Sequence, residues 1–356
     1  MSSVRVGMIS PYSFTLPGGV QMQALYLARA LRRRGLAVSL LGPCDGPPPE
    51  PDIIPIGNSL FIAANGSFAP IAFDIPAFQR SYAVLRDQRF DLLHVHEPLV
   101  PAPSLAALVS KRAPLVATFH AAGGSAAYEN VSPVLRWVCN RLDWRGAVSA
   151  EAADLARRHL GGTYEVLFNG VPVERFRQTK PHPTEGPTIF FVGRHEPRKG
   201  LEVLLAAMRR LPPDVVLWVG GEGPQTEILQ RRTANDRRIR WLGRLSEDEK
   251  ISRLCGADVF CAPSLHGESF GVVLLEAMAA ETAIVATDIP GYTRVARAGV
   301  EASLVPPGNA ERLAGALREV LATPGDLVTR GIERAEQFSM DRLAERYAAV
   351  YERVLA

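Results

Sequence analysis

Basic side chains and glycines gather in residues 191–200, which read Phe-Val-Gly-Arg-His-Glu-Pro-Arg-Lys-Gly. From this one loop Arg194 and Lys199 could reach a diphosphate, the arginine through its planar fork and the lysine as a point charge. Lysine occurs only four times among the 40 basic residues, so a lysine in such a loop is informative. A solvated cluster of surface charge is the alternative interpretation.

Two carboxylates stand in residues 264–279, which read Ser-Leu-His-Gly-Glu-Ser-Phe-Gly-Val-Val-Leu-Leu-Glu-Ala-Met-Ala. Glu268 stands before a predicted helix at residues 272–280, and Glu276 follows it by eight residues, about two helical turns, so we expect both on one helical face and directed at one ligand. Glu268 suits sugar hydroxyls, and Glu276 suits the vicinal hydroxyls of a ribose. The loop after Glu268 completes this candidate site through Ser269, Phe270 and Gly271. An amphipathic helix with one buried glutamate would not explain the loop glycines.

A third candidate site lies near the N-terminus, where Gly18 and Gly19 end a loop and open a predicted helix. Amide groups at the start of a helix favour an anion, and glycine lets a ligand approach the backbone closely. A plain N-terminal turn is the alternative, but the position after the first predicted strand is where α/β domains bind ligands.

The elements that must position these residues alternate between short β-branched runs and amphipathic helical patterns, which indicates parallel sheets with helices on both faces. The predicted strands are residues 4–9, 38–41, 92–95, 115–119, 146–149 and 165–168 in the first half and residues 189–192, 215–219, 239–242, 259–261 and 283–286 in the second. We therefore predict an α/β fold of two Rossmann-like, doubly wound domains, residues 1–171 and 172–339, facing across a cleft. The helical residues 340–356 would pack back onto the first domain.

Composition excludes several classes of protein. The chain has 356 residues, 47% of them hydrophobic and 22% charged, which is typical of a folded globular protein of about two domains. A net charge of +3 is too small for a dedicated nucleic-acid binder, so we expect no nucleic-acid partner. The four cysteines have no metal-ligand spacing, and no signal peptide or transmembrane run is evident, so we expect a cytoplasmic protein.

Together, these three segments resemble the retaining nucleotide-sugar glycosyltransferases of GT-B architecture, glycosyltransferase family four, over nearly the whole chain. The resemblance implies that Gly19 lies beside the donor diphosphate and that Arg194 and Lys199 hold its phosphates. It further implies that Glu268 holds the donor sugar and Glu276 the ribose. Transfer would proceed by front-face attack of an acceptor hydroxyl through an oxocarbenium-like transition state, with no metal and no other cofactor.

Four shorter segments, residues 11–21, 92–98, 116–120 and 267–271, resemble the actinobacterial phosphatidylinositol α-mannosyltransferases, which use GDP-mannose. This resemblance implies that Tyr12 and Gln21 face the acceptor and that His120 lies near the transferred sugar. Glu247, expected in the loop of residues 243–247, would accept hydrogen bonds from guanine. A lipid acceptor would make the protein peripheral at the inner face of the cell membrane.

The sequence departs from that subfamily on the acceptor side. Thr15 stands where the subfamily has an aspartate, and residues 68–72 lack the arginines expected to meet an acceptor phosphate. Arg80 is the nearest basic residue. We hypothesise either that Arg80 and its helix neighbours take over that role, or that the acceptor carries no phosphate at that place and is another lipid or a glycan.

Several alternatives therefore stay open: a UDP-sugar donor, a glycan or small-molecule acceptor, a GT-B epimerase or phosphorylase, and a non-catalytic module that binds sugar nucleotides. His94, His96 and Glu97 alternate as metal ligands could, but we expect hydrogen-bonded histidines and no metal.

Overall fold

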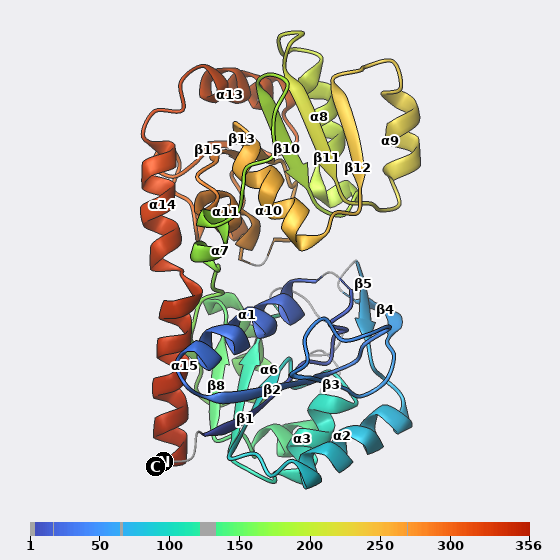
Figure 1. Cartoon of the computed structure of the whole chain (residues 1–356), viewed down its shortest axis with the longest axis vertical. Helices are drawn as coiled ribbons and strands as arrows, with labels where there is room; N and C mark the ends of the chain where they lie inside the picture. The colour runs from blue at the N-terminus through green and yellow to red at the C-terminus, as the bar shows by residue number, and fades with distance from the viewer. Residues whose placement is uncertain (1–3, 17, 65–66, 122–132, 269) are drawn as a thin grey trace. The chain divides into compact units, whose positions relative to one another are not determined.

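The computed structural model divides the chain into two compact units. Unit 1 comprises Met1–Gly170 together with Met340–Ala356, and unit 2 comprises Val171–Ser339 (Figure 1). Within them the structure describes residues 4–16, 18–64, 67–121, 133–268 and 270–356.

Unit 1 is built on a parallel sheet with the strand order β3-β2-β1-β6-β7-β8-β9. Its strands are β1 (Arg5–Ile9), β2 (Ala37–Gly42), β3 (Ile53–Pro55), β6 (Leu92–His96), β7 (Leu115–Phe119), β8 (Trp144–Ala147) and β9 (Glu165–Val166). The chain leaves β1 toward β2 on one side and later adds β6 on the other, so the strand order reverses at β1 and β6. Ligands of open α/β sheets bind at the carboxyl ends of the strands beside such a reversal.

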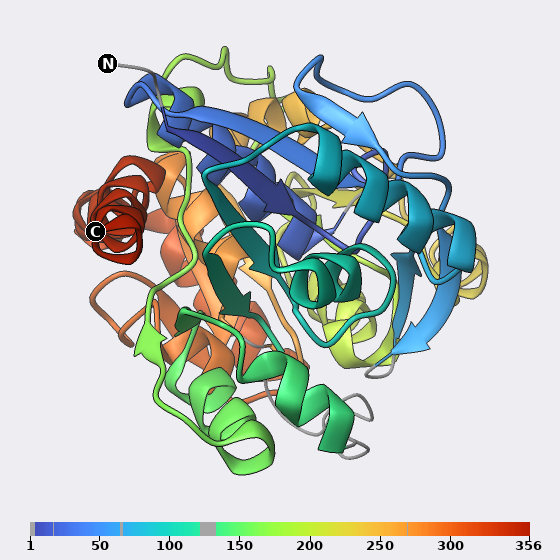
Figure 2. The same cartoon turned by 90° about the horizontal axis from the view of Figure 1, so that it is seen from below.

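Helices cover both faces of this sheet. They are α1 (Gly19–Arg33), α2 (Ile75–Asp87), α3 (Pro103–Ser110), α5 (Pro133–Cys139), α6 (Ala150–Leu160) and α15 (Met340–Leu355). One core layer joins β1 and β2 to α1 and α15, while the other joins β6 and β7 to α3 and α6. Viewed from below, α2 and α3 lie side by side in front of the sheet, and α15 is seen end-on (Figure 2).

Helix α15, the last segment of the chain, is part of the core of unit 1. Six of its side chains are almost fully buried against α1 and the sheet: Met340, Leu343, Ala344, Tyr347, Val350 and Tyr351. The structure thus shows the helical residues 340–355 packed in unit 1.

An antiparallel hairpin of β4 (Leu60–Ala64) and β5 (Ser67–Ile71) projects from unit 1. Tyr12 bridges to Ile71 at its base, which ties the loop after β1 to the hairpin.

Unit 2 repeats the same plan with the strand order β12-β11-β10-β13-β14-β15. Its strands are β10 (Thr188–Val192), β11 (Val216–Gly220), β12 (Ile239–Gly243), β13 (Val259–Ala262), β14 (Ala283–Thr287) and β15 (Ser303–Val305). The strand order reverses at β10 and β13, so the loops after these two strands lie beside each other at the carboxyl edge.

The helices of unit 2 also lie on both faces of its sheet. They are α7 (Val173–Arg177), the 3-10 turn η1 (Pro197–Lys199), α8 (Leu201–Met208), α9 (Thr226–Arg232), α10 (Glu247–Gly256), α11 (Val272–Ala279), α12 (Pro290–Thr293), α13 (Ala310–Ala322) and α14 (Leu327–Gln337). Helices α8 and α13 pack together over one face, and α10, α11 and α14 cover the other.

The predicted fold class is confirmed: both units are Rossmann-like, with parallel sheets between helical layers. Some boundaries differ. The strand expected at residues 146–149 is Trp144–Ala147, because Ser149 instead accepts the N–H of Ala152 and caps α6. No helix among the described residues is long and apolar enough to cross a membrane.

Candidate functional site

In unit 2, an ion pair joins the loops that follow the two strands where the order reverses. Lys199 Nζ lies 2.6 Å from Glu268 Oε1, and both side chains are largely buried. Gly200, directly after Lys199, has φ +67°, and any Cβ there would collide with the carbonyl oxygen of Pro263. Glycine therefore lets the two loops touch, which brings Lys199 to Glu268.

More charged side chains extend this cluster. Glu196 pairs with Arg194 at 2.7 Å and with Arg198 at 3.0 Å, and Arg198 lies 3.7 Å from Glu268. Three cations thus face two carboxylates, which leaves an excess of one positive charge. Arg194 is the most exposed of the three cations, with 41% of its side chain accessible, so an incoming phosphate can reach it.

Glu268 is held from its other side by hydroxyl groups. Ser264 Oγ donates to Glu268 Oε1 at 2.9 Å, and the Ser264 hydroxyl also pairs with the hydroxyl of Tyr292 at 2.9 Å. The carboxylate therefore has a fixed position.

The expectation that Glu268 and Glu276 share one helical face is wrong. Helix α11 begins only at Val272, and Gly271 before it has φ +78°, a left-handed conformation that ends the helix in that direction. Glu268 lies before the helix and Glu276 inside it, as predicted, but because Glu268 is not helical the two do not share a helical face.

Glu276 belongs to a second cluster centred on Lys250. Lys250 Nζ lies 2.9 Å from Glu276 and 3.0 Å from Glu247. Burial alone would lower the pKa of Lys250, but the carboxylates of Glu276 and Glu247 outweigh burial and raise it. Burial raises the pKa of Glu276, and Lys250 opposes that rise. Lys250 thus favours the charged form of the Glu276 carboxylate.

The remaining donor-side candidates are placed as follows. Glu247 is the first residue of α10, and not part of a loop, because Ser246 caps the helix by accepting the N–H of Glu249. The Phe270 side chain is buried and meets Phe338 edge-on, with ring centroids 5.9 Å apart. Ser269 lies outside the described residues.

The candidates in unit 1 all lie at the carboxyl edge of its sheet. Gly18 caps α1 and Gly19 begins it. Gln21 is buried, and its Nε2 donates to the carbonyl of Leu16 at 2.9 Å. The Gln21 amide thus fixes the backbone just before Gly18 and Gly19. Burial, and then the Glu97 carboxylate, raise the pKa of Tyr12.

His120 follows β7 and is held by groups that the sequence did not single out as site residues. Its backbone N–H donates to Glu97 Oε1 at 2.7 Å, and its ring Nε2 lies 2.9 Å from Nδ1 of His96. Burial raises the pKa of Glu97 to about 7, although the amides of His120 and Ala121 lower it. Glu97 also has φ +51°, an uncommon conformation for a residue with a side chain.

Three residues were thus missed as site residues: Arg198, Lys250 and Glu97. Arg198 stands beside Lys199 in the same loop, and the scarcity of lysine could have drawn attention to Lys250. No local signal predicts the burial of Glu97. Among the described residues no cluster of histidine, cysteine or acidic side chains could hold a metal ion.

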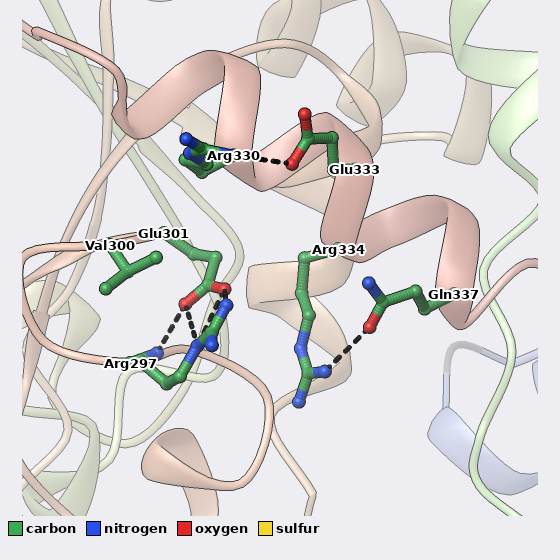
Figure 3. Close-up of a pocket in the computed structure, with 7 residues that line it drawn as sticks. All are labelled: Arg297, Val300, Glu301, Arg330, Glu333, Arg334 and Gln337. Carbon is green, nitrogen blue, oxygen red and sulfur yellow. Dashed lines mark hydrogen bonds and ion pairs between the residues drawn. The ribbon is translucent and has the colours of Figure 1, made fainter.

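A separate pocket of about 310 Å³ lies in unit 2 between α14 and the segment of residues 297–301 (Figure 3). Arg297 pairs with the buried Glu301, Arg330 pairs with Glu333, and Arg334 donates to the carbonyls of Arg294 and Val295. These arginines are engaged with the protein itself. Arg334 also lies over the ring of Phe338, 4.7 Å from its centroid, and the same ring contacts Phe270.

Unit 2 carries clustered charges at the carboxyl edge of its sheet, and the two Rossmann-like units match the architecture of GT-B glycosyltransferases. The family model described as Glycosyl transferases group 1 matches residues 172–338, and the one described as Glycosyltransferase Family 4 matches residues 17–175. The chain belongs to glycosyltransferase family 4, and the predicted resemblance is confirmed.

Individual relatives agree with this assignment. The phosphatidyl-myo-inositol mannosyltransferase of Mycolicibacterium smegmatis is 38% identical, over 99% of this chain and 94% of that protein. Among solved structures, sucrose-phosphate synthase from Thermosynechococcus elongatus has a TM-score of 0.75 at 20% identity, covering 99% of each chain. Anabaena HepE in complex with UDP-glucose has a TM-score of 0.72 at 18% identity, covering 98% of this chain and 99% of that one. These two similarities concern the fold.

Proposed function

We propose that this glycosyltransferase moves mannose from GDP-mannose to a hydroxyl of phosphatidylinositol, with retention of the anomeric configuration. The observation that carries the proposal is the Arg194, Arg198 and Lys199 cluster, tied to Glu268 by the 2.6 Å pair with Lys199. In this cluster, cations that can bind a diphosphate lie next to a fixed carboxylate that can accept hydrogen bonds from a sugar. The 38% identity to a phosphatidyl-myo-inositol mannosyltransferase supports the choice of sugar and acceptor.

In the proposed reaction the acceptor hydroxyl attacks the anomeric carbon from the face that the diphosphate leaves. Arg194 and Lys199 stabilise the negative charge that grows on the leaving phosphate, and such preorganised donors lower the barrier most in a site that excludes water. Glu268 accepts hydrogen bonds from the mannose hydroxyls, and the leaving phosphate takes the acceptor proton. Because side chains supply the positive charge, the reaction needs no metal ion.

The proposed choice of guanine rests on Glu247. A carboxylate accepts hydrogen bonds only, which matches the neighbouring N–H groups on one edge of guanine, whereas uracil offers no such pair. Lys250 pairs with both Glu247 and Glu276, so the proposed base and ribose contacts share one anchor. A UDP-sugar is the competing donor.

A lipid acceptor is supported by apolar side chains exposed on unit 1. Leu60 and Phe61 in β4, Phe73 in the next loop and Ile75 at the start of α2 are 56% to 73% exposed. Such a group of exposed apolar residues is typical of a membrane-surface or binding site. We propose that this surface meets the bilayer that carries the acceptor.

The acceptor phosphate needs a cation, and Arg80 on α2 is the proposed one. Its Nε donates to the carbonyl of Ile56 at 2.6 Å, which holds the guanidinium near the loop that leads to the hairpin.

The test is a transfer assay with GDP-mannose, UDP-glucose and UDP-galactose as donors, each with phosphatidylinositol vesicles, neutral glycosides or free myo-inositol. We expect turnover with GDP-mannose and phosphatidylinositol, and an α-linked product by proton NMR. Transfer only from a UDP-sugar would refute the donor. Transfer only to glycosides would refute the acceptor, and a β-linked product would refute retention.

Arg80→Ala is expected to reduce transfer to phosphatidylinositol and leave binding of GDP unchanged. Arg86→Ala, on the same helix but paired with Asp87, is the matched control. Full lipid mannosylation by Arg80→Ala would exclude Arg80 as the phosphate partner.

A further inference from the structure

Three buried histidines form a row across the strands of unit 1. The rings of His94 and His96 stack with centroids 4.4 Å apart, and His96 contacts His120 through the 2.9 Å bond between Nδ1 and Nε2. His94 is satisfied at both nitrogens, because Nδ1 meets the hydroxyl of Tyr351 and Nε2 meets Thr118 Oγ1, both at 2.7 Å. His96 differs from it: its Nε2 is buried and has no hydrogen-bond partner among the described residues.

All three imidazoles are neutral near pH 7. Burial lowers the pKa of His94 and of His120 to about 3, with a smaller effect of His120 on His94. Burial, and then the other two histidines, lower the pKa of His96 well below its usual value. Each ring therefore carries one proton, and the position of that proton decides what each nitrogen can do.

The bond between His96 and His120 contains one proton, and two arrangements are conceivable. If Nε2 of His120 were the donor, His96 would carry its own proton on Nε2, where no described residue accepts it. A buried N–H without an acceptor is rare and costly, whereas a buried acceptor without a donor is better tolerated. The favoured arrangement therefore has the proton on Nδ1 of His96, donated to Nε2 of His120.

We propose that His96 is a positioning residue that fixes His120 as the tautomer protonated on Nδ1. His120 then presents a hydrogen-bond donor, and not a base, at the carboxyl end of β7. Its Nε2 is occupied by His96, and its Nδ1 makes no hydrogen bond to any described residue. That the group receiving this hydrogen bond is an oxygen of the donor sugar rests on the proposed function.

The tautomer itself can be read without any substrate. Protein labelled with nitrogen-15 in its histidines, studied by long-range nitrogen-proton correlation NMR, distinguishes protonated from unprotonated ring nitrogens. The His120 signals are assigned by their loss in His120→Asn. We expect His120 to be protonated on Nδ1 alone. Protonation on Nε2 would overturn the proposal, and this measurement stands whatever the donor and acceptor prove to be.

Activity of two matched pairs of variants tests the role of the proton. Asparagine places its amide near the position of Nδ1 and glutamine near that of Nε2, so His120→Asn keeps the proposed donor and His120→Gln loses it. We expect kcat/KM of His120→Asn to exceed that of His120→Gln by about threefold to tenfold, the value of one neutral hydrogen bond. Equal activities, or the reverse order, would overturn the donor role.

The second pair concerns His96. His96→Asn can still donate to Nε2 of His120 and should keep both the Nδ1 tautomer and most of the activity, whereas His96→Leu should lose both. His182→Asn, in unit 2, is the control for histidine replacement. If His96→Leu leaves the His120 tautomer unchanged, His96 does not set it, and the proposal fails even if activity falls through altered packing.

Discussion

Lys199 and Glu268 form a 2.6 Å ion pair between the two loops where the strand order of unit 2 reverses. We assign the Lys199 cation to the leaving phosphate and the Glu268 carboxylate to the sugar. The ion pair means that these two charges are not independent of each other. Each is neutralised by the other before the donor binds, so neither charge is left buried alone.

Lys199→Ala should lower kcat strongly and leave the fold in place, because Arg198 at 3.7 Å and the Ser264 hydroxyl at 2.9 Å still contact the Glu268 carboxylate. Loss of a preorganised donor to developing negative charge typically costs on the order of 2.7 to 4 kcal/mol. Steady-state kinetics on protein with an unchanged circular dichroism spectrum check this. Lys180→Ala, at an exposed position, is the control. A change of kcat below threefold would show that Lys199 does not stabilise the leaving phosphate.

Glu276→Ala should weaken the binding of GDP and GDP-mannose alike, because ribose contacts exist before and during the reaction. Hydrogen bonds to a charged group contribute about 1.5 to 3 kcal/mol, so affinity should fall about tenfold or more. Isothermal calorimetry with GDP measures the loss. Unchanged affinity would make the ribose assignment wrong.

Lys250→Met should make GDP binding depend on pH. Burial already raises the pKa of Glu276, and loss of Lys250 removes the charge that opposes the rise. As the pH falls, Glu276 of the variant therefore takes up a proton at a higher pH than Glu276 of the wild type does. The ratio of variant to wild-type Kd should therefore be larger at pH 6 than at pH 8. Lys250→Arg keeps the charge and should behave like the wild type, and a ratio independent of pH would show that Lys250 does not control Glu276.

Glu97 should make unit 1 less stable as the pH rises. Its pKa is about 7 in the folded chain against an ordinary 4.5, so between these values the folded state binds more protons than the unfolded state. The contribution is intact below about pH 4.5 and is lost as the pH passes 7. The shift corresponds to about 3 kcal/mol.

The variant Glu97→Gln isolates this effect, because the buried histidines contribute equally to both proteins. The difference in the free energy of unfolding should move in favour of Glu97→Gln by about 3 kcal/mol between pH 4.5 and pH 8. Urea denaturation at the two pH values provides the measurement. A constant difference would mean that Glu97 titrates normally.

Activity should survive EDTA, since Arg194, Arg198 and Lys199 supply the positive charge that a divalent cation provides in other transferases. The assay compares turnover after chelation with turnover after Mg²⁺ is added back. An absolute requirement for the metal would contradict the cation cluster.

The sequence predicted the fold class because alternating strands and helices leave a periodic pattern along the chain. The helix predicted to open at Gly18 and Gly19 is α1, which runs from Gly19 to Arg33. The hairpin of β4 and β5 was not predicted, although the sequence there contains Asn-Gly, a dipeptide that is common in hairpins.

The candidate site was harder to predict, because charge pairing depends on contacts between distant segments. Lys250 and Glu276 are 26 residues apart and meet only when α10 packs against α11. The prediction that Glu268 and Glu276 share a helical face was wrong for a local reason. The spacing of the two residues does not reveal that the backbone of Gly271 is in the left-handed region. Glu97 was considered only as a metal ligand, whereas it binds the backbone of His120.

The burial of α15 in unit 1 has a consequence for biosynthesis. Tyr347 and Tyr351 complete the polar contacts of Thr118 and His94, yet they are translated more than 220 residues later. While the ribosome is still making unit 2, the apolar surface of α1 that α15 will cover stays open to solvent. Unit 1 therefore begins to emerge first but cannot finish folding until α15 has been made, and the growing chain should depend on chaperones until α15 leaves the exit tunnel.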